Sequence, residues 1–389
     1  MKTLALLAAT AFCLPAFGSP SVSRAPLGQA EPGAPPLGLT VRGSALLRGG
    51  QRFRGIGVNY FDAFYRHLKK PEDTSYEAGF QALDEAKIPF ARVCGCGFWP
   101  VEQKLYREDK AAFFRRLDDV VRSAQRHHIG LIPSLFWNTA TVPDLVGEPV
   151  SAWGDPASKT RAYMKSYVRD VVARYKNSPA IWGWEFGNEF NLSASLPNAA
   201  QQRPPVWPGL GTAASRSEQD DVTFEIIRAA FVAFAREVRR YDADRLISTG
   251  DSLPRPSSWH QWHEKSWQPD TPEQQAQVLA ADTPDPVSVV SIHAYEKSEA
   301  SLREALATAH KLKKPLFVGE FGAPGPPEKS EQDFNSLLSV IEAGKVPLAA
   351  LWVFDLQQQD ATFNVTAGNA RSYQLRAISA ANARIRAAK

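Results

Sequence analysis

The chain has 389 residues, of which 44% are hydrophobic and 22% are charged, and its formal net charge is +4. These values are typical of a soluble globular protein. Basic and acidic residues are interspersed along the chain, so the sequence indicates neither a nucleic-acid-binding stripe nor a charged tail. After the first residues, no stretch is apolar for long enough to span a bilayer. We therefore expect neither a nucleic acid nor a membrane as the partner.

The N-terminus has the pattern of a secretory signal peptide. Lys2 gives a short basic start, residues 4–17 are mainly apolar, and Ala16 and Gly18 supply small residues before a cleavage point. Prolines recur between residues 19 and 39, which predicts an extended linker. We expect residues 1–18 to be the signal peptide, residues 19–39 to be the linker, and the protein to be secreted or periplasmic.

From residue 40 onward, short apolar runs alternate with longer segments of helical periodicity. Eight runs are predicted as strands: Arg54–Asn59, Ile88–Cys94, Ile129–Leu135, Ile181–Phe186, Arg245–Ser248, Val287–Ile292, Pro315–Val318 and Leu348–Val353. Seven segments are predicted as helices: Tyr76–Lys87, Ala111–His128, Ser158–Lys176, Glu218–Tyr241, Ser301–Lys313, Glu331–Ala343 and Tyr373–Ala388.

The predicted strands have no polar face, which is typical of a parallel sheet covered by helices. Eight repeats favour a closed barrel over an open sheet. No Gly-x-Gly-x-x-Gly follows the first strand, so a nucleotide site is not indicated. The sequence therefore predicts an α/β protein with a (β/α)8 TIM barrel, in which residues 40–389 form a single catalytic domain. In such barrels the active-site residues follow the C-terminal ends of the strands.

Two glutamates follow apolar runs on the fourth and seventh predicted strands, Glu189 and Glu320. A carboxylate in apolar, glycine-rich surroundings is costly unless partners satisfy it. One such glutamate could belong to a structural ion pair, but these two face each other across one barrel mouth. A retaining glycosidase needs this arrangement, because it uses a carboxylic acid and a nucleophilic carboxylate about 5–5.5 Å apart.

The motifs around these glutamates resemble glycoside hydrolase family 5, the family of cellulases and β-mannanases, and the resemblance covers residues 40–389. The family's Asn-Glu pair at the end of strand four is matched by Asn188 and Glu189, which implies that Glu189 is the acid/base. Its strand-seven glutamate is matched by Glu320, the implied nucleophile. Asn188 is then expected to bind the sugar 2-hydroxyl, a hydrogen bond that strengthens in the transition state.

Four further matches imply substrate-binding residues. Arg92 on strand two and Tyr295 on strand six are expected to hold Glu320 ionised, because a cation and a phenol donor both favour a carboxylate. His293 precedes Tyr295 in the family's His-x-Tyr motif and is expected to contact the sugar or the acid/base, with core packing as the alternative. Trp352 on strand eight is expected to lie beneath the reacting sugar.

The end of the third strand departs from the family pattern. Many members have a histidine there, whereas this chain has Trp137 and Asn138, which we expect to take over its substrate contacts. Glu185 lies four residues before Glu189 and is expected to form a buried structural ion pair with Arg92.

Residues 192–217 form a long segment between a predicted strand and the next helix, and Trp207 lies within it. Long loops in compact domains tend to be functional, so we expect this one to wall one side of the substrate cleft. Cys94 and Cys96 are the two cysteines left after the signal peptide. Two thiols do not make a disulfide scaffold, and we expect small buried residues at a strand end.

Two other motifs have weaker support. Gly250-Asp251-Ser252-Leu253 spells an esterase signature, but the chain lacks the Asp-x-x-His that would complete its catalytic triad. His260, His263 and Glu264 could ligate zinc, but the His-Glu-x-x-His spacing of zinc peptidases is absent. We therefore expect no metal ion and no cofactor.

The site residues together predict a monomeric retaining glycoside hydrolase that cleaves a β-1,4-linked polysaccharide or oligosaccharide, of mannan or cellulose type, by double displacement. The sequence leaves two alternatives open. One is a transglycosylase that uses the same carboxylates, and the other is a carbohydrate-binding barrel without catalysis. The identity of the sugar also stays open, because mannose and glucose differ in the orientation of one hydroxyl group.

Overall fold

The structure is a computed structural model that describes residues 36–295 and 297–388. The predicted signal peptide and most of the predicted linker lie outside the described residues. The linker was expected to reach residue 39, and this boundary is wrong by one residue, because Leu39 is fully buried and begins the first strand.

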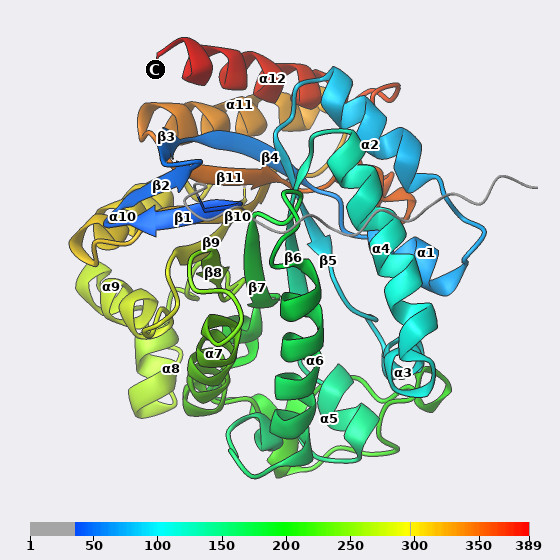
Figure 1. Cartoon of the computed structure of the whole chain (residues 1–389). Helices are drawn as coiled ribbons and strands as arrows, with labels where there is room; N and C mark the ends of the chain where they lie inside the picture. Colours follow the sequence, from blue (N-terminus) through cyan, green and yellow to red (C-terminus); the bar gives the residue numbers. More distant parts are fainter. Residues whose placement is uncertain (1–35, 296, 389) are drawn as a thin grey trace, which may run out of the picture.

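Eight parallel strands form a nearly closed barrel surrounded by helices, which confirms the predicted (β/α)8 fold (Figure 1). In chain order the strands are β4 (Gly55–Asn59), β5 (Phe90–Cys94), β6 (Gly130–Phe136), β7 (Gly183–Gly187), β8 (Leu246–Ser248), β9 (Val290–Tyr295), β10 (Leu316–Gly322) and β11 (Leu348–Leu351). They pair in the order β8-β7-β6-β5-β4-β11-β10-β9. The two ends meet where the backbone N–H of Ser288 donates to the carbonyl oxygen of Ile247 at 3.0 Å.

The helices of the described chain lie around the barrel (Figure 1). They are α1 (Ala63–Lys69), α2 (Tyr76–Glu85), α3 (Pro100–Glu108), α4 (Lys110–Arg126), α5 (Thr141–Val146), α6 (Lys159–Tyr175), α7 (Phe224–Arg239), α8 (Ser258–Glu264), α9 (Pro272–Ala281), α10 (Glu299–Lys311), α11 (Pro327–Ala343) and α12 (Ser372–Ala387). Short 3-10 turns are η1 (Val150–Trp153), η2 (Phe190–Ser193), η3 (Ala199–Gln201), η4 (Pro208–Leu210), η5 (Glu218–Asp220) and η6 (Gln357–Gln359).

All seven predicted helices are present, but five helices were not predicted: α1, α3, α5, α8 and α9. Each has ten residues or fewer, which is too short for a clear helical period to emerge from the sequence. No helix in the described part of the chain has the length and apolar character that a membrane span requires.

A small antiparallel sheet covers the N-terminal end of the barrel and was also missed by the sequence analysis. It consists of β1 (Leu39–Arg42), β2 (Ala45–Arg48) and β3 (Gln51–Phe53). Leu39 and Leu46 pack with side chains from the beginnings of the barrel strands, and the Arg48 guanidinium lies 4.2 Å from the centre of a Trp182 ring. Because this end is filled with apolar side chains, the opposite end is left for polar residues.

Candidate active site

The predicted site residues all lie on or directly after barrel strands, at the C-terminal ends. They are Arg92 on β5, Trp137 and Asn138 after β6, Asn188 and Glu189 after β7, His293 and Tyr295 on β9, Glu320 on β10, and Trp352 after β11. The closed barrel therefore gathers residues that are up to 260 positions apart in sequence.

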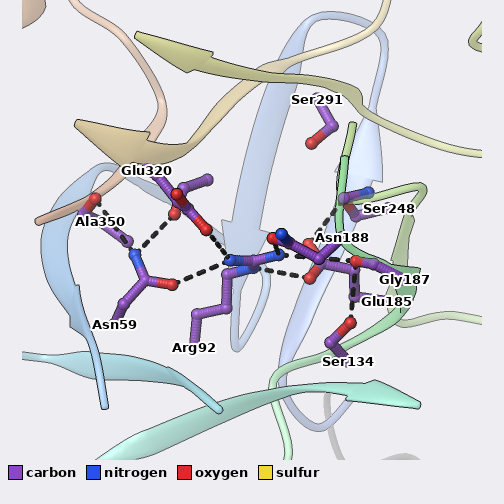
Figure 2. Close-up of polar contacts among 12 residues, drawn as sticks. Asn59, Arg92, Ser134, Glu185, Gly187, Asn188, Ser248, Ser291, Glu320 and Ala350 are labelled. Atoms are coloured by element: carbon purple, nitrogen blue, oxygen red, sulfur yellow. Dashed lines mark hydrogen bonds and ion pairs between the residues drawn. The ribbon is translucent and has the colours of Figure 1, made fainter. Parts of the chain in front are cut away.

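Arg92 is fully buried and connects four side chains from three other strands (Figure 2). Its Nε donates to Glu185 at 2.6 Å, which confirms the expected buried ion pair. Its Nη1 donates to Glu320 at 2.8 Å and to Asn59 at 3.0 Å, and its Nη2 donates to Asn188 at 2.8 Å. Burial alone would lower the pKa of Arg92, but the carboxylates of Glu185 and Glu320 raise it above its usual value.

Asn59 was not singled out from the sequence. Its side-chain amide donates to the carbonyl oxygen of Gly319 at 2.8 Å, directly before Glu320, while its Oδ1 accepts from Arg92. Asn59 thus links the cation to the backbone that carries the carboxylate. The sequence did contain a signal for this role, because Asn59 is the polar last residue of a predicted strand.

Glu320 lies within strand β10, where the register with β9 shifts between Val318 and Glu320, and it is 3% exposed. One carboxylate oxygen accepts from Arg92, and the other accepts a short hydrogen bond from the Tyr295 hydroxyl. The Nδ1 atom of His293 lies 3.5 Å from this second oxygen. Burial and the neighbouring Glu320 carboxylate both raise the pKa of Tyr295 well above its usual value, so the phenol remains a donor. Glu320 is therefore held on both oxygens.

Glu189 has a different local structure. Its backbone is left-handed, with φ 55° and ψ 33°, a conformation that is uncommon for residues other than glycine. Its N–H donates to the carbonyl oxygen of Gly250 at 2.9 Å. A Cβ atom at Gly250 would lie 2.0 Å from the Gly187 oxygen, so only glycine allows this close approach. The turn directs Glu189 away from the line of the strand.

The Glu189 carboxylate is partly exposed and contacts His293. The side chain is 29% exposed, and its Oε1 lies 2.8 Å from Nδ1 of His293. Burial would raise the pKa of Glu189, but the His293 hydrogen bond and charge, together with Arg92 and Ser252, lower it below its usual value. Glu189 is thus the more accessible of the two carboxyl groups.

Asn191 and Ser252 hold the loop after β7 against the loop after β8. The Asn191 side chain donates to the Ser252 carbonyl oxygen at 2.8 Å and accepts from the Ser252 N–H at 3.2 Å. The Ser252 side chain also interacts with the Glu189 carboxylate and lowers its pKa. Ser252, the serine of the esterase-like motif, therefore supports Glu189. The sequence analysis missed this role, although both residues lie in the loops after predicted strands.

The carboxyl groups of Glu189 and Glu320 are close enough to act on the same bond. Glu189, His293 and Glu320 each place one nitrogen or oxygen atom within 4.8 Å of the other two. This spacing would suit a metal ion as well, but Arg92 and Tyr295 already occupy both oxygens of Glu320. The arrangement therefore fits acid and nucleophile chemistry on a bond that lies between the carboxyl groups.

The side chains that follow β6 and β11 differ in how deeply they are buried. Trp352 is half-buried, and its Nε1 donates to Gln359 at 2.9 Å. Trp137 is 5% exposed and lies beneath Arg92, with the guanidinium 4.4 Å from the centre of a ring. The Oδ1 atom of Asn138 accepts from the Ala140 N–H at 3.1 Å. The expected substrate contacts of Trp137 and Asn138 stay predictions, and both side chains already have structural partners.

The remaining sequence motifs have structural explanations. Cys94 and Cys96 are buried and unpaired by disulfide, with their sulfur atoms 3.7 Å apart, as expected. His260 contacts Asp270 through Nδ1 at 2.7 Å, and the Asp270 carboxylate also accepts backbone N–H groups at the start of α8.

Comparison with known proteins identifies relatives of this chain. The family model "Cellulase (glycosyl hydrolase family 5)" matches residues 98–353, more than half of the chain. A probable mannan endo-1,4-beta-mannosidase A of Aspergillus flavus is 29% identical over 201 residues, which are 46% of this chain and 49% of that protein. Mannan endo-1,4-beta-mannosidase A of Podospora anserina is 38% identical over 81 residues, 19% of this chain and 21% of that protein. The chain thus spans about a fifth to a half of the length of these curated relatives.

Solved structures support the fold. The endo-1,4-beta-mannanase of Rhizomucor miehei superposes with a TM-score of 0.66 at 15% identity, over 89% of this chain and 99% of that chain. The exo-beta-1,4-mannosidase of Opitutaceae bacterium strain TAV5 gives a TM-score of 0.60 at 15% identity, over 89% of this chain and 63% of that chain. At such low identity these matches establish a shared barrel and no more.

Proposed function

The chain belongs to glycosyl hydrolase family 5, and on this basis we propose that it is a retaining glycoside hydrolase acting on a β-1,4-linked mannan-type polysaccharide. The observation that carries the proposal is the close approach of Glu189 and Glu320, because one carboxylate oxygen of each lies within 4.8 Å of one oxygen of the other. An inverting enzyme needs room for a water molecule between its carboxyl groups, which then lie roughly 6.5–9.5 Å apart. The observed spacing favours direct attack by one carboxylate.

In the first step Glu320 attacks the anomeric carbon and the glycosidic bond breaks, while Glu189 gives its proton to the leaving oxygen. Arg92 and Tyr295 support the ionised, fixed state that a nucleophile needs. Arg92 also occupies Oδ1 of Asn188, and we assign the remaining Nδ2 donor to the sugar 2-hydroxyl. Trp352 supplies an apolar surface for the reacting sugar.

In the second step a water molecule attacks the anomeric carbon, gives its proton to Glu189, and releases Glu320 as a carboxylate. Esterification removes the negative charge of Glu320, so Glu189 loses a repelling neighbour and its pKa falls. Substrate binding has the opposite effect in the first step, because exclusion of water favours the protonated form of Glu189. The same carboxyl group can therefore serve as acid and then as base.

The choice of mannan over cellulose is supported by the curated relatives, which are named mannan endo-1,4-beta-mannosidases. We also infer that the enzyme acts outside the cytoplasm, because residues 1–18 have the composition of a signal peptide. N-terminal sequencing of the mature protein tests this inference, and an uncleaved Met1 would contradict it.

Proton NMR of the first-formed product tests the mechanism. Retention requires that a β-linked substrate first gives the β-anomer, and early release of the α-anomer would contradict it. A panel of mannan, carboxymethylcellulose, xylan and laminarin tests the substrate class, with the highest kcat/KM expected on mannan. Higher activity on carboxymethylcellulose would correct the substrate and leave the mechanism standing. Binding without turnover on every substrate would favour a carbohydrate-binding barrel.

A further inference from the structure

An exposed apolar patch lies on the loop side of the barrel. Among the described residues, four large hydrophobic side chains are exposed, and three of them are Val101, Val206 and Trp207. The loop that carries Val206 and Trp207 packs against Val101 at Gly211, where a Cβ atom would lie 3.3 Å from the valine side chain. Exposure of a large indole to water is unfavourable and calls for a functional reason.

Trp207 is 55% exposed, although its loop is well held. One face of the indole stacks on Trp99, with ring centroids 5.5 Å apart and an angle of 27° between the planes. The loop is anchored by Arg216, which forms a buried two-point ion pair with Asp144 at 2.7 and 2.8 Å and donates to the Pro204 carbonyl oxygen. The Trp207 ring is therefore held against Trp99, while the residue remains 55% exposed.

A continuous row of aromatic rings joins this patch to the candidate active site. From Trp352 the row runs through Phe61, Phe98 and Trp99 to Trp207, and neighbouring ring centroids are 6.4, 6.0, 5.0 and 5.5 Å apart. Each ring belongs to a segment that follows a barrel strand, so the row stays on the catalytic face. Phe61, Phe98 and Trp99 are only partly buried.

We propose that the Trp99–Trp207 pair is a distal sugar-binding platform, on which a pyranose several units from the cleavage point stacks against the exposed indole of Trp207. The proposal rests on the glycosidase function proposed above. It adds that the enzyme prefers a polysaccharide to a short oligosaccharide as its substrate. Pyranose rings present flat C–H faces that stack well on indoles. A short oligosaccharide cleaved at Glu189 and Glu320 would not reach this platform, whereas a polysaccharide would.

Affinity electrophoresis in gels that contain galactomannan or carboxymethylcellulose tests the platform without requiring turnover. The parent is the inactive Glu320→Ala protein, into which Trp207→Ala, Trp207→Phe or Val206→Ala is introduced. We expect Trp207→Ala to weaken retardation by about 3- to 10-fold in apparent affinity in at least one of the two gels. Trp207→Phe should retain most of the retardation, because an aromatic face remains. Val206→Ala is the matched control, because it leaves the indole in place.

In the active protein, Trp207→Ala should raise KM for galactomannan by a similar factor, while kcat and the hydrolysis of an aryl β-mannobioside stay unchanged. Equal retardation of Trp207→Ala and its parent in both gels would overturn the platform, even if hydrolysis by Glu189 and Glu320 is established. Loss of activity on the aryl mannobioside as well, with a lowered Tm, would assign Trp207 a structural role and also overturn it. A change of oligomeric state in ultracentrifugation, with retardation unchanged, would assign the patch to a contact between protein chains instead.

Discussion

Glu320 and Glu189 lie at the ends of two barrel strands, yet the chain around them differs. Glu320 lies within strand β10, is almost fully buried, and has partners on both oxygens, Arg92 and Tyr295. Glu189 follows its strand in a left-handed turn, is partly exposed, and is held by His293 and by a loop contact.

This difference indicates that Glu320 and Glu189 have different roles in the reaction. A nucleophile must stay ionised and aimed, which a permanent cation and a phenol donor provide. An acid/base must exchange a proton with the leaving group and with water, which requires access and an adjustable pKa. The hydrogen bond and charge of His293 lower the Glu189 pKa. Substitutions that exchange or remove these supports test the assignment.

The largest effect is expected from Glu320→Ala. Without the nucleophile no glycosyl–enzyme bond can form, so kcat should fall by roughly 10⁴-fold or more. Azide should enter the vacated space and restore turnover of an aryl β-glycoside, giving an α-glycosyl azide, because attack then occurs once with inversion. Product analysis by NMR measures this outcome, and full activity without azide would refute the role of Glu320.

Glu189→Ala should lower kcat/KM on polysaccharide by about 10²- to 10⁴-fold, the usual contribution of general acid–base catalysis. The first step on a dinitrophenyl glycoside should be nearly unaffected, because that leaving group departs without a proton. Azide should now intercept the glycosyl–enzyme and give a β-glycosyl azide. If both glutamate variants gave the same azide anomer, the proposed division of roles would be wrong.

Tyr295→Phe tests the fixed environment of Glu320. Hydrogen bonds to charged groups contribute about 1.5–3 kcal/mol, so kcat should fall roughly 10- to 100-fold. The matched control is Tyr60→Phe, because Tyr60 is also buried and donates to a carboxylate, Asp355, that lies outside the proposed site. The control should lower Tm without a comparable loss of kcat. Equal kinetic losses in both variants would indicate a general packing effect.

The sequence predicted the barrel and the two glutamates because both depend on local patterns. Buried parallel strands are short continuous apolar runs, and a barrel places whatever polar residue ends each run at one mouth. Arg92, Glu189 and Glu320 therefore stood out against apolar neighbours. The pairing of Arg92 with Glu185 followed from the same reasoning, since both charges lie within buried runs and need a partner.

Other features depend on contacts that no local pattern reveals. Residues 40–53 contain Arg42, Arg48 and Arg52 among short apolar stretches and were assigned to no strand or helix from the sequence, yet most of them form the sheet over the barrel end. The Asn191–Ser252 contact follows the left-handed turn at Glu189, whose N–H donates to the Gly250 carbonyl oxygen of another loop. Such conformations are fixed by tertiary structure and not by the residue type.

The smallest effect is expected from His293→Ala, which tests whether the Glu189 pKa is set by its surroundings. Burial raises this pKa, and the His293 interaction is the largest of those that lower it. Its removal should raise the Glu189 pKa, so the protonated acid persists to higher pH. The alkaline limb of the kcat/KM profile should therefore move to higher pH, with a loss of about tenfold at the optimum. Ser252→Ala removes a weaker interaction of the same sign and should move the limb less. A limb that stays in place in both variants, or moves to lower pH, would mean that another group carries the acid function.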